Sequence, residues 1–339
     1  MRVTLRDLAK ACGVSVATVS YVLNNSPRHV HPRTRERVLA AMRELDYHPN
    51  AVARGLCSKR MNTLGVVTPY WPAPEVDLYF ATILHGIMVT AQQNRQCTLL
   101  FTHGSLEAPM DEVPIYLDGR CDGLLFVGGV VDRVIETLKR KQMPLVAVHE
   151  PSSDTEVSTI DVDNVAAARE IVEYLVRQGH RRIAYLSGET TLRSSLQRLE
   201  GYRQALEAAG IPYEEGLVWP GGYNTPSGYL RTIEHLHKNR RGRPTALFCA
   251  GDGIAIGALE ALHELGIRVP TEMSVVGFDD ISAAASSHPP LTTMRQPLRD
   301  IGSRAAELLL EQIKASRWLG RKEVMPTELI VRDSVAPPS

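Results

Sequence analysis

The sequence predicts two parts, an N-terminal all-α helix-turn-helix head and an α/β core of two lobes. Residues 1–60 space apolar side chains at helical intervals around a glycine turn, and from Leu64 onward short apolar strands alternate with helical stretches. The chain has 339 residues, of which 44% are hydrophobic. This length is greater than a single hydrophobic core usually organises. More than one domain is therefore expected.

The charge distribution supports the same division. Residues 1–60 carry eleven basic and four acidic side chains, which leaves 27 basic and 34 acidic ones for the remainder, so a head of +7 precedes a core of −7 in a chain with formal net charge 0. A cationic head favours binding to phosphates, although a merely solvated basic surface is the alternative.

Two short helices are expected on either side of Gly13. Thr4 caps the first, with Asp7 in its first turn, and this helix ends near Cys12. Gly13 supplies the tight turn and Ser15 caps the second helix, whose Val19, Val22 and Leu23 pack back on the first.

The outward face of the second helix carries small and apolar side chains. In helix-turn-helix proteins the N-terminal part of this helix enters the major groove. Val16 and Ala17 can contact thymine methyl groups but cannot form bidentate hydrogen bonds, and Tyr21 is the expected polar contact. The alternative is that Val16 and Ala17 are ordinary helix residues.

His31 and Pro32 begin a third helix, with Val38, Ala41, Met42 and Leu45 on one face. Asn50 then caps residues 51–56, a segment too short to be a stable helix alone in water. We expect this segment to become ordered only when something holds it.

The head resembles that of the LacI/GalR family of bacterial transcriptional repressors. The resemblance rests on VTLRDLAKACGVSVATVS, TRERVLAAMRELDYHPN and AVARGL. It implies that the last segment is a hinge helix that folds on DNA and inserts Leu56 into the minor groove, where unstacking a base step is offset by added contacts. The alternative is that Leu56 packs into its own domain. The implied DNA-binding residues are Thr4, Ser15, Val16, Ala17, Thr18, Ser20, Tyr21, Asn24, His29, Asn50, Ala53, Arg54 and Leu56.

Strand and helix patterns repeat twice along the core. Parallel α/β layers in two similar lobes follow, with ligands expected between the lobes. The expected strands are Leu64–Thr68, Thr98–Thr102, Gly123–Val127 and Pro144–Val148, then Arg182–Ser187, Thr245–Ala250 and Met273–Asp279.

The core also resembles the same family, in GHRRIAYLSG, in TALFCAGDGIAIGALEALHELGIRVPTEMSVVGFDDISAA, and in PPLTTMRQP and ELIVRDS. The resemblance implies the bilobed type I periplasmic-binding-protein fold, with three crossings between lobes near Asp161, Pro289 and Glu323. The implied domains are residues 1–49 (helix-turn-helix), 50–61 (hinge helix and linker), 62–161 with about 292–322 (first lobe), and 162–291 with about 323–339 (second lobe).

An effector site follows from the resemblance by motif position. Its implied residues are Tyr79, Phe80, Arg198, Tyr223, Asp252 and Asp279, with Asp163 and Asn164 as weaker additions. His149, at a strand end where family members vary, is also assigned to the site. Carboxylates and a guanidinium hydrogen-bond vicinal hydroxyls, and aromatic rings stack on sugars, so a sugar is the expected effector.

Five of these effector residues have a plainer alternative. Asp252 and Asp279 follow strands and could simply cap the next helix. Arg198 could form a surface pair with Glu200 or Asp163, and Tyr223 and His149 could lie at the rim without touching a ligand.

Two departures from the family limit what the resemblance implies about the effector. The loop that begins at Pro69 is longer and more aromatic than its counterparts, and Leu192 stands where purine-binding members carry a basic residue. The second departure argues against a nucleobase effector.

Several function classes are not expected. The five scattered cysteines suggest neither zinc nor a redox pair, and no catalytic or phosphate-loop motif is found, so no metal, no cofactor and no enzyme activity are expected. No apolar run of about 18 residues and no leader is found, so a cytoplasmic protein is expected rather than a membrane protein or an exported solute-binding protein.

The resemblance implies a homodimer whose two heads bind a pseudo-palindromic double-stranded operator, with DNA affinity set by the small molecule bound between the lobes. No leucine heptads follow Val335, so a dimer is preferred over a tetramer. Whether the effector is an inducer or a corepressor stays open, because that depends on which lobe arrangement it prefers.

Overall fold

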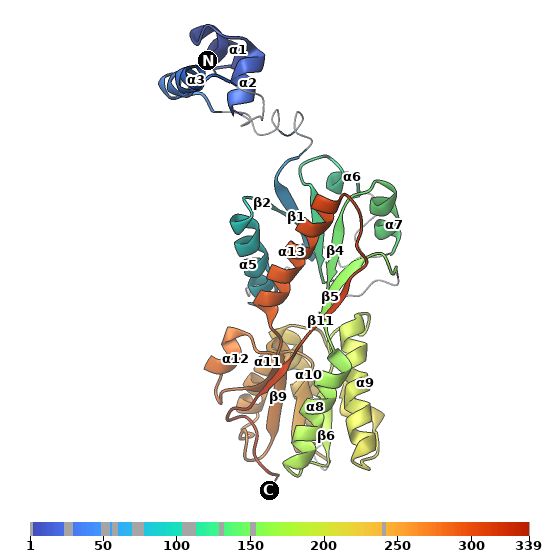
Figure 1. The fold of residues 1–339 in the computed structure, drawn as a ribbon. Helices are drawn as coiled ribbons and strands as arrows, with labels where there is room; N and C mark the ends of the chain where they lie inside the picture. The colour runs from blue at the N-terminus through green and yellow to red at the C-terminus, as the bar shows by residue number, and fades with distance from the viewer. Residues whose placement is uncertain are drawn as a thin grey trace. The chain divides into compact units, whose positions relative to one another are not determined.

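The head, residues 3–48, is a small three-helix unit in this computed structural model, which describes residues 3–23, 30–48, 55, 60–69, 78–103, 113–128, 132–149, 154–238 and 242–338. Its helices are α1 (Leu5–Ala11), α2 (Val16–Leu23) and α3 (Pro32–Glu44) (Figure 1). Leu8, Val19, Val22, Val38 and Tyr47 form its buried core. The predicted helix limits and the predicted inward stripe are confirmed, because each apolar repeat buries one face of its helix.

The core contains two six-stranded sheets. The first has the order β11-β5-β4-β3-β1-β2 and the second β12-β10-β9-β8-β6-β7. The strands of the first sheet are β1 (Thr63–Pro69), β2 (Cys97–His103), β3 (Gly123–Val127), β4 (Leu145–Val148), β5 (Ser158–Val162) and β11 (Lys322–Met325). Those of the second are β6 (Ile183–Leu186), β7 (Val218–Trp219), β8 (Ala246–Cys249), β9 (Ser274–Asp279), β10 (Thr292–Arg295) and β12 (Glu328–Ile330).

The central strand pairs of both sheets are parallel, and β12 runs antiparallel to β10. Strands β3, β4, β5, β6, β8 and β9 are buried along their whole length, as expected when helices cover both faces of a parallel sheet. The seven predicted strands lie in the two sheets, and the short strands β5, β7, β10, β11 and β12 had no predicted counterpart.

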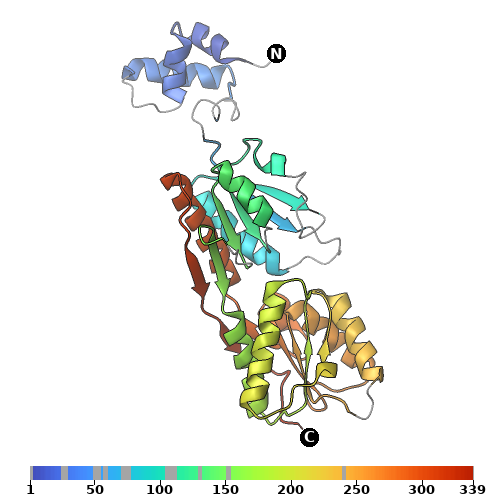
Figure 2. The same cartoon turned by 90° about the vertical axis from the view of Figure 1, so that its right-hand side faces the viewer.

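Helices pack in pairs on the sheets (Figure 2). The helices of the first lobe are α5 (Leu78–Gln93), α6 (Val113–Tyr116), α7 (Asp132–Arg140) and α13 (Leu298–Ala315). Those of the second are α8 (Asn164–Arg177), α9 (Arg193–Ala208), the 3₁₀ turn η2 (Glu215–Leu217), α10 (Thr225–Lys238), α11 (Asp252–Glu264) and α12 (Ser282–Ser286). The pairs α5 with α13, α8 with α9, and α10 with α11 are in extensive contact.

Two predicted lobe boundaries need correction. Residues Thr292–Arg295 were assigned to the first lobe, but β10 pairs with β9 of the second sheet. Residues from Glu323 were assigned to the second lobe, but β11 pairs with β5 of the first sheet. The chain therefore crosses between the sheets after Val162, after Arg295 and after Met325. Strand pairing decides these limits, and short runs such as TTMR and KEVM carry no periodic signal for it.

The late segment after Gln296 does complete the first lobe. Helix α13 packs on β3, β4 and β5 and against α5. The two helices touch through glycine, since a Cβ on Gly302 would lie 2.0 Å from the carbonyl oxygen of Ile83, and one on Gly86 would lie 2.0 Å from that of Arg299. No helix within the described ranges is long and apolar enough to cross a membrane.

Candidate functional site

The start of α1 is held by a reciprocal cap. Asp7 N donates to Thr4 Oγ1 (3.3 Å), and Thr4 N and Oγ1 donate to Asp7 Oδ2 (2.9 and 2.6 Å). The hydrogen bonds from Thr4 lower the pKa of Asp7, as expected for a carboxylate that accepts at a helix N-terminus. The predicted capping role of Thr4 is confirmed, and its contact with DNA stays a prediction.

Helix α2 presents its first turn to solvent. Ser15 Oγ accepts from Thr18 N (3.1 Å) and lies 2.9 Å from Thr18 Oγ1, so these hydroxyls cap the helix. Val16 is 40% exposed and Ala17 is also exposed, whereas Ser20 and Tyr21 are half-buried. The face predicted to meet base edges is accessible and mainly apolar.

The remaining DNA-binding predictions cannot be placed. Asn24, His29, Asn50, Ala53, Arg54 and Leu56 lie outside the described residues. The same holds for most of the loop that follows Pro69.

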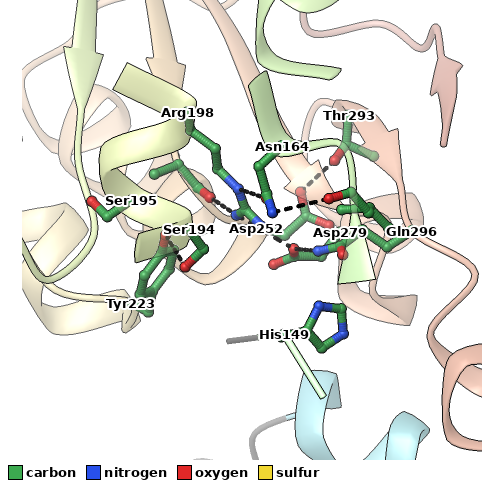
Figure 3. A network of polar contacts seen from close by, with 12 residues as sticks. His149, Asn164, Ser194, Ser195, Arg198, Tyr223, Asp252, Asp279, Thr293 and Gln296 are labelled. Carbon is green, nitrogen blue, oxygen red and sulfur yellow. Dashed lines mark hydrogen bonds and ion pairs between the residues drawn. The ribbon is translucent and has the colours of Figure 1, made fainter. Parts of the chain in front are cut away.

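A second group of polar side chains lies at the carboxyl ends of strands from both sheets. It comprises His149 after β4, Asp161 in β5, Asn164 at the start of α8, Arg198 in α9, Asp279 at the end of β9 and Gln296 after β10. We call these six residues the polar network; Figure 3 labels all of them except Asp161. In parallel α/β folds the carboxyl ends of the strands are where ligands bind, because the helices and loops that follow them converge there.

Arg198 is the central cation of the polar network and is 3% exposed. Its Nε donates to Asn164 Oδ1 (2.9 Å). Its Nη1 donates to the carbonyl oxygen of Ala250 and also lies 3.8 Å from Asp279 Oδ1. The guanidinium also stacks on the Phe278 ring, 3.6 Å from its centroid. The alternative of a surface pair with Glu200 or Asp163 is wrong, because Arg198 is buried among other partners.

Asp252 and Asp279 are buried carboxyl groups, and neither caps a helix by its side chain. Asp252 Oδ1 accepts from Thr293 Oγ1 (2.6 Å) and its Oδ2 from Ile281 N (2.9 Å). Asp279 Oδ1 accepts from Gln296 Nε2 (2.7 Å). Burial raises the pKa of Asp252 well above its ordinary value, and nearby Asp279 raises it further.

The backbone turns sharply where Asp279 leaves β9. Asp279 and the next residue, Asp280, have φ values of 116° and 56°. Such values are unusual for residues other than glycine and occur most often at functional sites. Asp280 is held on both sides, by Arg295 Nε (2.7 Å) and Arg332 Nη2 (2.6 Å), and these ion pairs offset the strain.

Aromatic rings line the first-lobe side of the polar network. The Tyr79 ring centroid lies 5.2 Å from that of Phe80 and 5.5 Å from that of His149. Burial raises the pKa of Tyr79 well above its ordinary value, and Asp279 raises it further, so the phenol keeps its proton.

Tyr223 packs against the backbone of the second lobe, whereas Asp163 caps a helix at the surface. The Tyr223 ring packs directly on Gly188, where a Cβ would be 2.1 Å from its Cε2, and its hydroxyl lies 3.5 Å from Ser194 Oγ. Asp163 is exposed and accepts from Ala166 N (2.9 Å), which caps α8. The capping alternative thus describes Asp163 rather than Asp252 or Asp279.

Two members of the polar network, Asp161 and Gln296, were not assigned to the effector site from the sequence, and a third, Asn164, was only a weaker addition. Asn164 joins Arg198 to Asp161, since its Nδ2 donates to Asp161 Oδ1 (3.3 Å). Asp161 was noted in the sequence only as a crossing point between lobes, and Gln296 fell only within the range of about 292–322 assigned to the first lobe. A polar residue at the end of a buried strand was the available signal for both.

A separate surface hollow of about 640 Å³ lies on α10, lined by Pro226, Leu230, Arg231 and neighbouring residues. It contains no member of the polar network. Among the described residues, no group of three or more His, Cys, Asp or Glu side chains is placed to hold a metal ion.

Family models match both parts of the chain. Residues 4–50 match the model for bacterial regulatory proteins of the lacI family, and residues 172–335 match the model for a periplasmic binding protein-like domain. These matches agree with the helix-turn-helix head and the two-sheet core.

Curated relatives match over nearly the whole length. The HTH-type transcriptional regulator DegA of Bacillus subtilis is 30% identical over 99% of this chain and 99% of its own. Catabolite control protein A of Priestia megaterium is 32% identical over 91% and 92%, and the repressor PurR of Vibrio atlanticus is 32% identical over 98% of each chain.

Solved structures of LacI family regulators are also similar to this chain over nearly its whole length. The lac repressor dimer bound to operator and the anti-inducer ONPF has a TM-score of 0.87 at 30% identity, covering 99% of this chain and all of that one. The regulator CelR in complex with cellobiose has a TM-score of 0.74 at 33% identity, covering 98% and 100%. The fold, the head and the relatives together show that the chain is a DNA-binding transcriptional regulator of the LacI family.

Proposed function

We propose that the protein is a homodimeric repressor whose two heads bind the half-sites of a pseudo-palindromic operator, and whose DNA affinity is set by a small polyhydroxyl ligand, most simply a sugar, at the polar network. The observation that carries the proposal is the exposed, apolar first turn of α2 on a cationic head. A regulator of this kind works beside the chromosome, in the cytoplasm, and needs neither cofactor nor enzyme activity.

The ligand half of the proposal rests on the polar network and on relatives. Carboxylates, a guanidinium and aromatic rings gather at the carboxyl ends of both sheets, which suits hydroxyl groups and the apolar face of a sugar. CelR was solved with cellobiose, and a LacI family regulator of Enterococcus faecium with ribose. The effector contacts of Tyr79, Phe80, His149, Asp163, Arg198, Tyr223, Asp252 and Asp279 remain part of this proposal.

The coupling follows from linkage. A ligand that prefers one arrangement of the lobes changes DNA affinity by the ratio of its affinities for the two arrangements, and DNA changes ligand affinity by the same factor. Depending on which arrangement favours DNA, the ligand is an inducer or a corepressor.

The test is DNA binding by fluorescence anisotropy, with the region upstream of the protein's own gene and a shuffled duplex of equal length. We expect affinity for the upstream duplex to fall steeply with salt, by about 10³- to 10⁵-fold between 50 and 200 mM if six to ten phosphates are contacted. Weak, salt-insensitive binding that does not distinguish the two duplexes would refute the DNA-binding half.

A matched pair of variants separates base contact from charge. Ala17 and Ala40 are both exposed helical alanines of the head, on α2 and α3. Ala17→Glu places a carboxylate against the base edges and should abolish discrimination between the duplexes. Ala40→Glu changes the charge equally and should lower both affinities alike. Equal behaviour of the two variants would exclude α2 as the base-reading helix.

A further inference from the structure

The His149 side chain holds a buried ring nitrogen that no donor in the described part of the chain reaches. The residue is 6% exposed, and its Nδ1 lies 3.2 Å from Asp161 Oδ1. Asp161 Oδ1 also accepts from Val162 N (2.7 Å) and Asn164 Nδ2 (3.3 Å), so it is a carboxylate oxygen surrounded by donors. The imidazole must therefore donate through Nδ1–H, and in the neutral ring this makes Nε2 an acceptor. That Nε2 has no hydrogen-bond partner among the described residues.

Gln296, which follows β10 of the second sheet, shows the same pattern: it donates to a carboxylate and leaves a buried acceptor atom unpaired among the described residues. It is 3% exposed, and its Nε2 donates to Asp279 Oδ1 at 2.7 Å. Because Asp279 also faces Arg198, this carboxyl oxygen is an acceptor and the amide must turn its NH₂ group toward it. Gln296 Oε1 is left buried with no partner in the described part of the chain.

Two other buried oxygens are also unpaired among the described residues, and neither changes this pattern. Thr68 Oγ1, near the end of β1, belongs to a hydroxyl that can donate or accept. Gln312 Oε1 lies in α13, where Gln312 Nε2 donates to the carbonyl oxygen of Leu145 at the start of β4, the opposite end of that strand from His149.

The charges around these acceptors do not favour an anion. Arg198 directs Nε and Nη1 to Asn164 Oδ1 and the Ala250 carbonyl, and its charge is offset by Asp279. Asp161 adds a further carboxylate beside His149. Figure 3 shows the His149 ring below Asp279 and Gln296, on the side of the polar network nearest the first lobe. A carboxylate or phosphate placed here would meet two bare acceptors and two carboxylates.

This inference rests on the proposed function, in which the polar network is the ligand site. We propose that this site has a defined polarity, meaning that it selects ligands that offer hydroxyl or N–H donors to His149 Nε2 and Gln296 Oε1 and carry no negative charge. It rejects the acid and phosphate forms of the same carbon skeleton. A ligand that leaves a buried acceptor unpaired loses on the order of 10- to 100-fold in affinity per missing donor. The rule covers neutral polyols and amino sugars alike.

The first measurement needs no ligand. In ¹⁵N-histidine-labelled full-length protein at about pH 8, above the ordinary histidine pKa of about 6.5, the His149 signals are assigned by their loss in His149→Phe. We expect a protonated Nδ1 and an unprotonated Nε2. A protonated Nε2 would overturn the proposal, because the site would then offer a donor.

The second measurement compares compounds that share a skeleton. Calorimetric titrations use glucose, glucosamine, gluconate and glucose 6-phosphate, and the galactose, ribose and cellobiose series with their acid or phosphate forms. We expect every binding compound to be neutral or cationic, with its anionic form at least 10-fold weaker. An anionic form that binds as tightly as its neutral partner would overturn the proposal.

Variants connect the preference to the named atom. His149→Phe keeps an aromatic ring beside Tyr79 but removes the acceptor, so it should weaken the neutral ligand about 10- to 100-fold and leave the anionic form nearly unchanged. His85→Phe changes an exposed histidine of α5 and should alter neither affinity. An anionic compound that binds at the polar network as tightly as its neutral partner and changes operator affinity would leave the proposed function intact and refute the preference for uncharged ligands. If no compound of either charge affects operator binding, the effector role fails, and the tautomer of His149 still decides the polarity.

Discussion

Replacement of Arg198 by alanine should lower the free energy of unfolding of the second lobe, independently of any role of Arg198 in ligand binding. The change leaves Asn164 Oδ1 and the Ala250 carbonyl without their donors and Asp279 without its counter-charge, all in a buried setting. Removing one partner of a buried ion pair costs about 3–5 kcal/mol, and each buried acceptor left unpaired costs about 1–3 kcal/mol, with some relief from water entering the space. Even with this relief, we expect a total loss of about 5 kcal/mol.

Arg203 provides the matched control on the same helix. It is exposed, donates to the Tyr213 hydroxyl (3.0 Å) and stacks over that ring at 4.6 Å. An exposed contact of this kind contributes about 0.5–1 kcal/mol, so Arg203→Ala should be nearly neutral. Arg198→Lys keeps the charge but not the planar set of donors, and should fall between the two.

The assay is urea denaturation of the full chain, with hydrogen exchange read on the amides of β8 and β9, the strands that end beside Arg198. Loss of protection should be confined to the second lobe in Arg198→Ala. If Arg198→Ala and Arg203→Ala cost the same to within about 0.5 kcal/mol, Arg198 is not a buried structural tie and the reasoning is refuted. A loss of effector response in Arg198→Ala must therefore be judged beside its stability.

Three further changes test other parts of the chain. Gly302→Ala pushes a Cβ to 2.0 Å from the Ile83 carbonyl oxygen and should destabilise the first lobe by about 2–4 kcal/mol, whereas Gly253→Ala, whose Cβ meets nothing closer than 3.7 Å, should be neutral or slightly stabilising in thermal unfolding. Asp252→Asn should make stability less dependent on pH: the raised pKa of Asp252 means that wild-type stability falls as pH rises from the ordinary value of 3.8 toward the folded one, so the variant should gain relative to wild type in urea titrations from acid to neutral pH, and a constant difference would contradict this. Leu56→Ala should weaken specific more than non-specific DNA binding in anisotropy titrations, and an equal loss on both would count against a minor-groove wedge.

The three helices of the head could be predicted from the sequence, because their signals are local. Thr4 and Asp7 form a cap three residues apart, Gly13 has the positive φ (58°) of a turn, and the Val19 and Val22 stripe buries one face of α2. Each of these depends on neighbours within about one helical turn.

The candidate site could be predicted only in part. Motif position indicated Arg198, Asp279 and Tyr79, which the structure places in the site together with His149, and as a weaker addition Asp163, which caps a helix. Nothing along the sequence distinguishes a capping aspartate from a buried one, because both follow a strand and precede a helix.

The sequence by itself determined the local order of helices and strands, the cationic head and the family. Only the tertiary structure decided that β10 belongs to the second sheet and β11 to the first. It also decided that Asn164 and Gln296 complete the polar network, and that His149 offers Nε2 as a hydrogen-bond acceptor. The physical reason is that hydrogen-bond direction in a buried site depends on partners contributed by distant strands, and those partners are set by sheet pairing rather than by any local pattern.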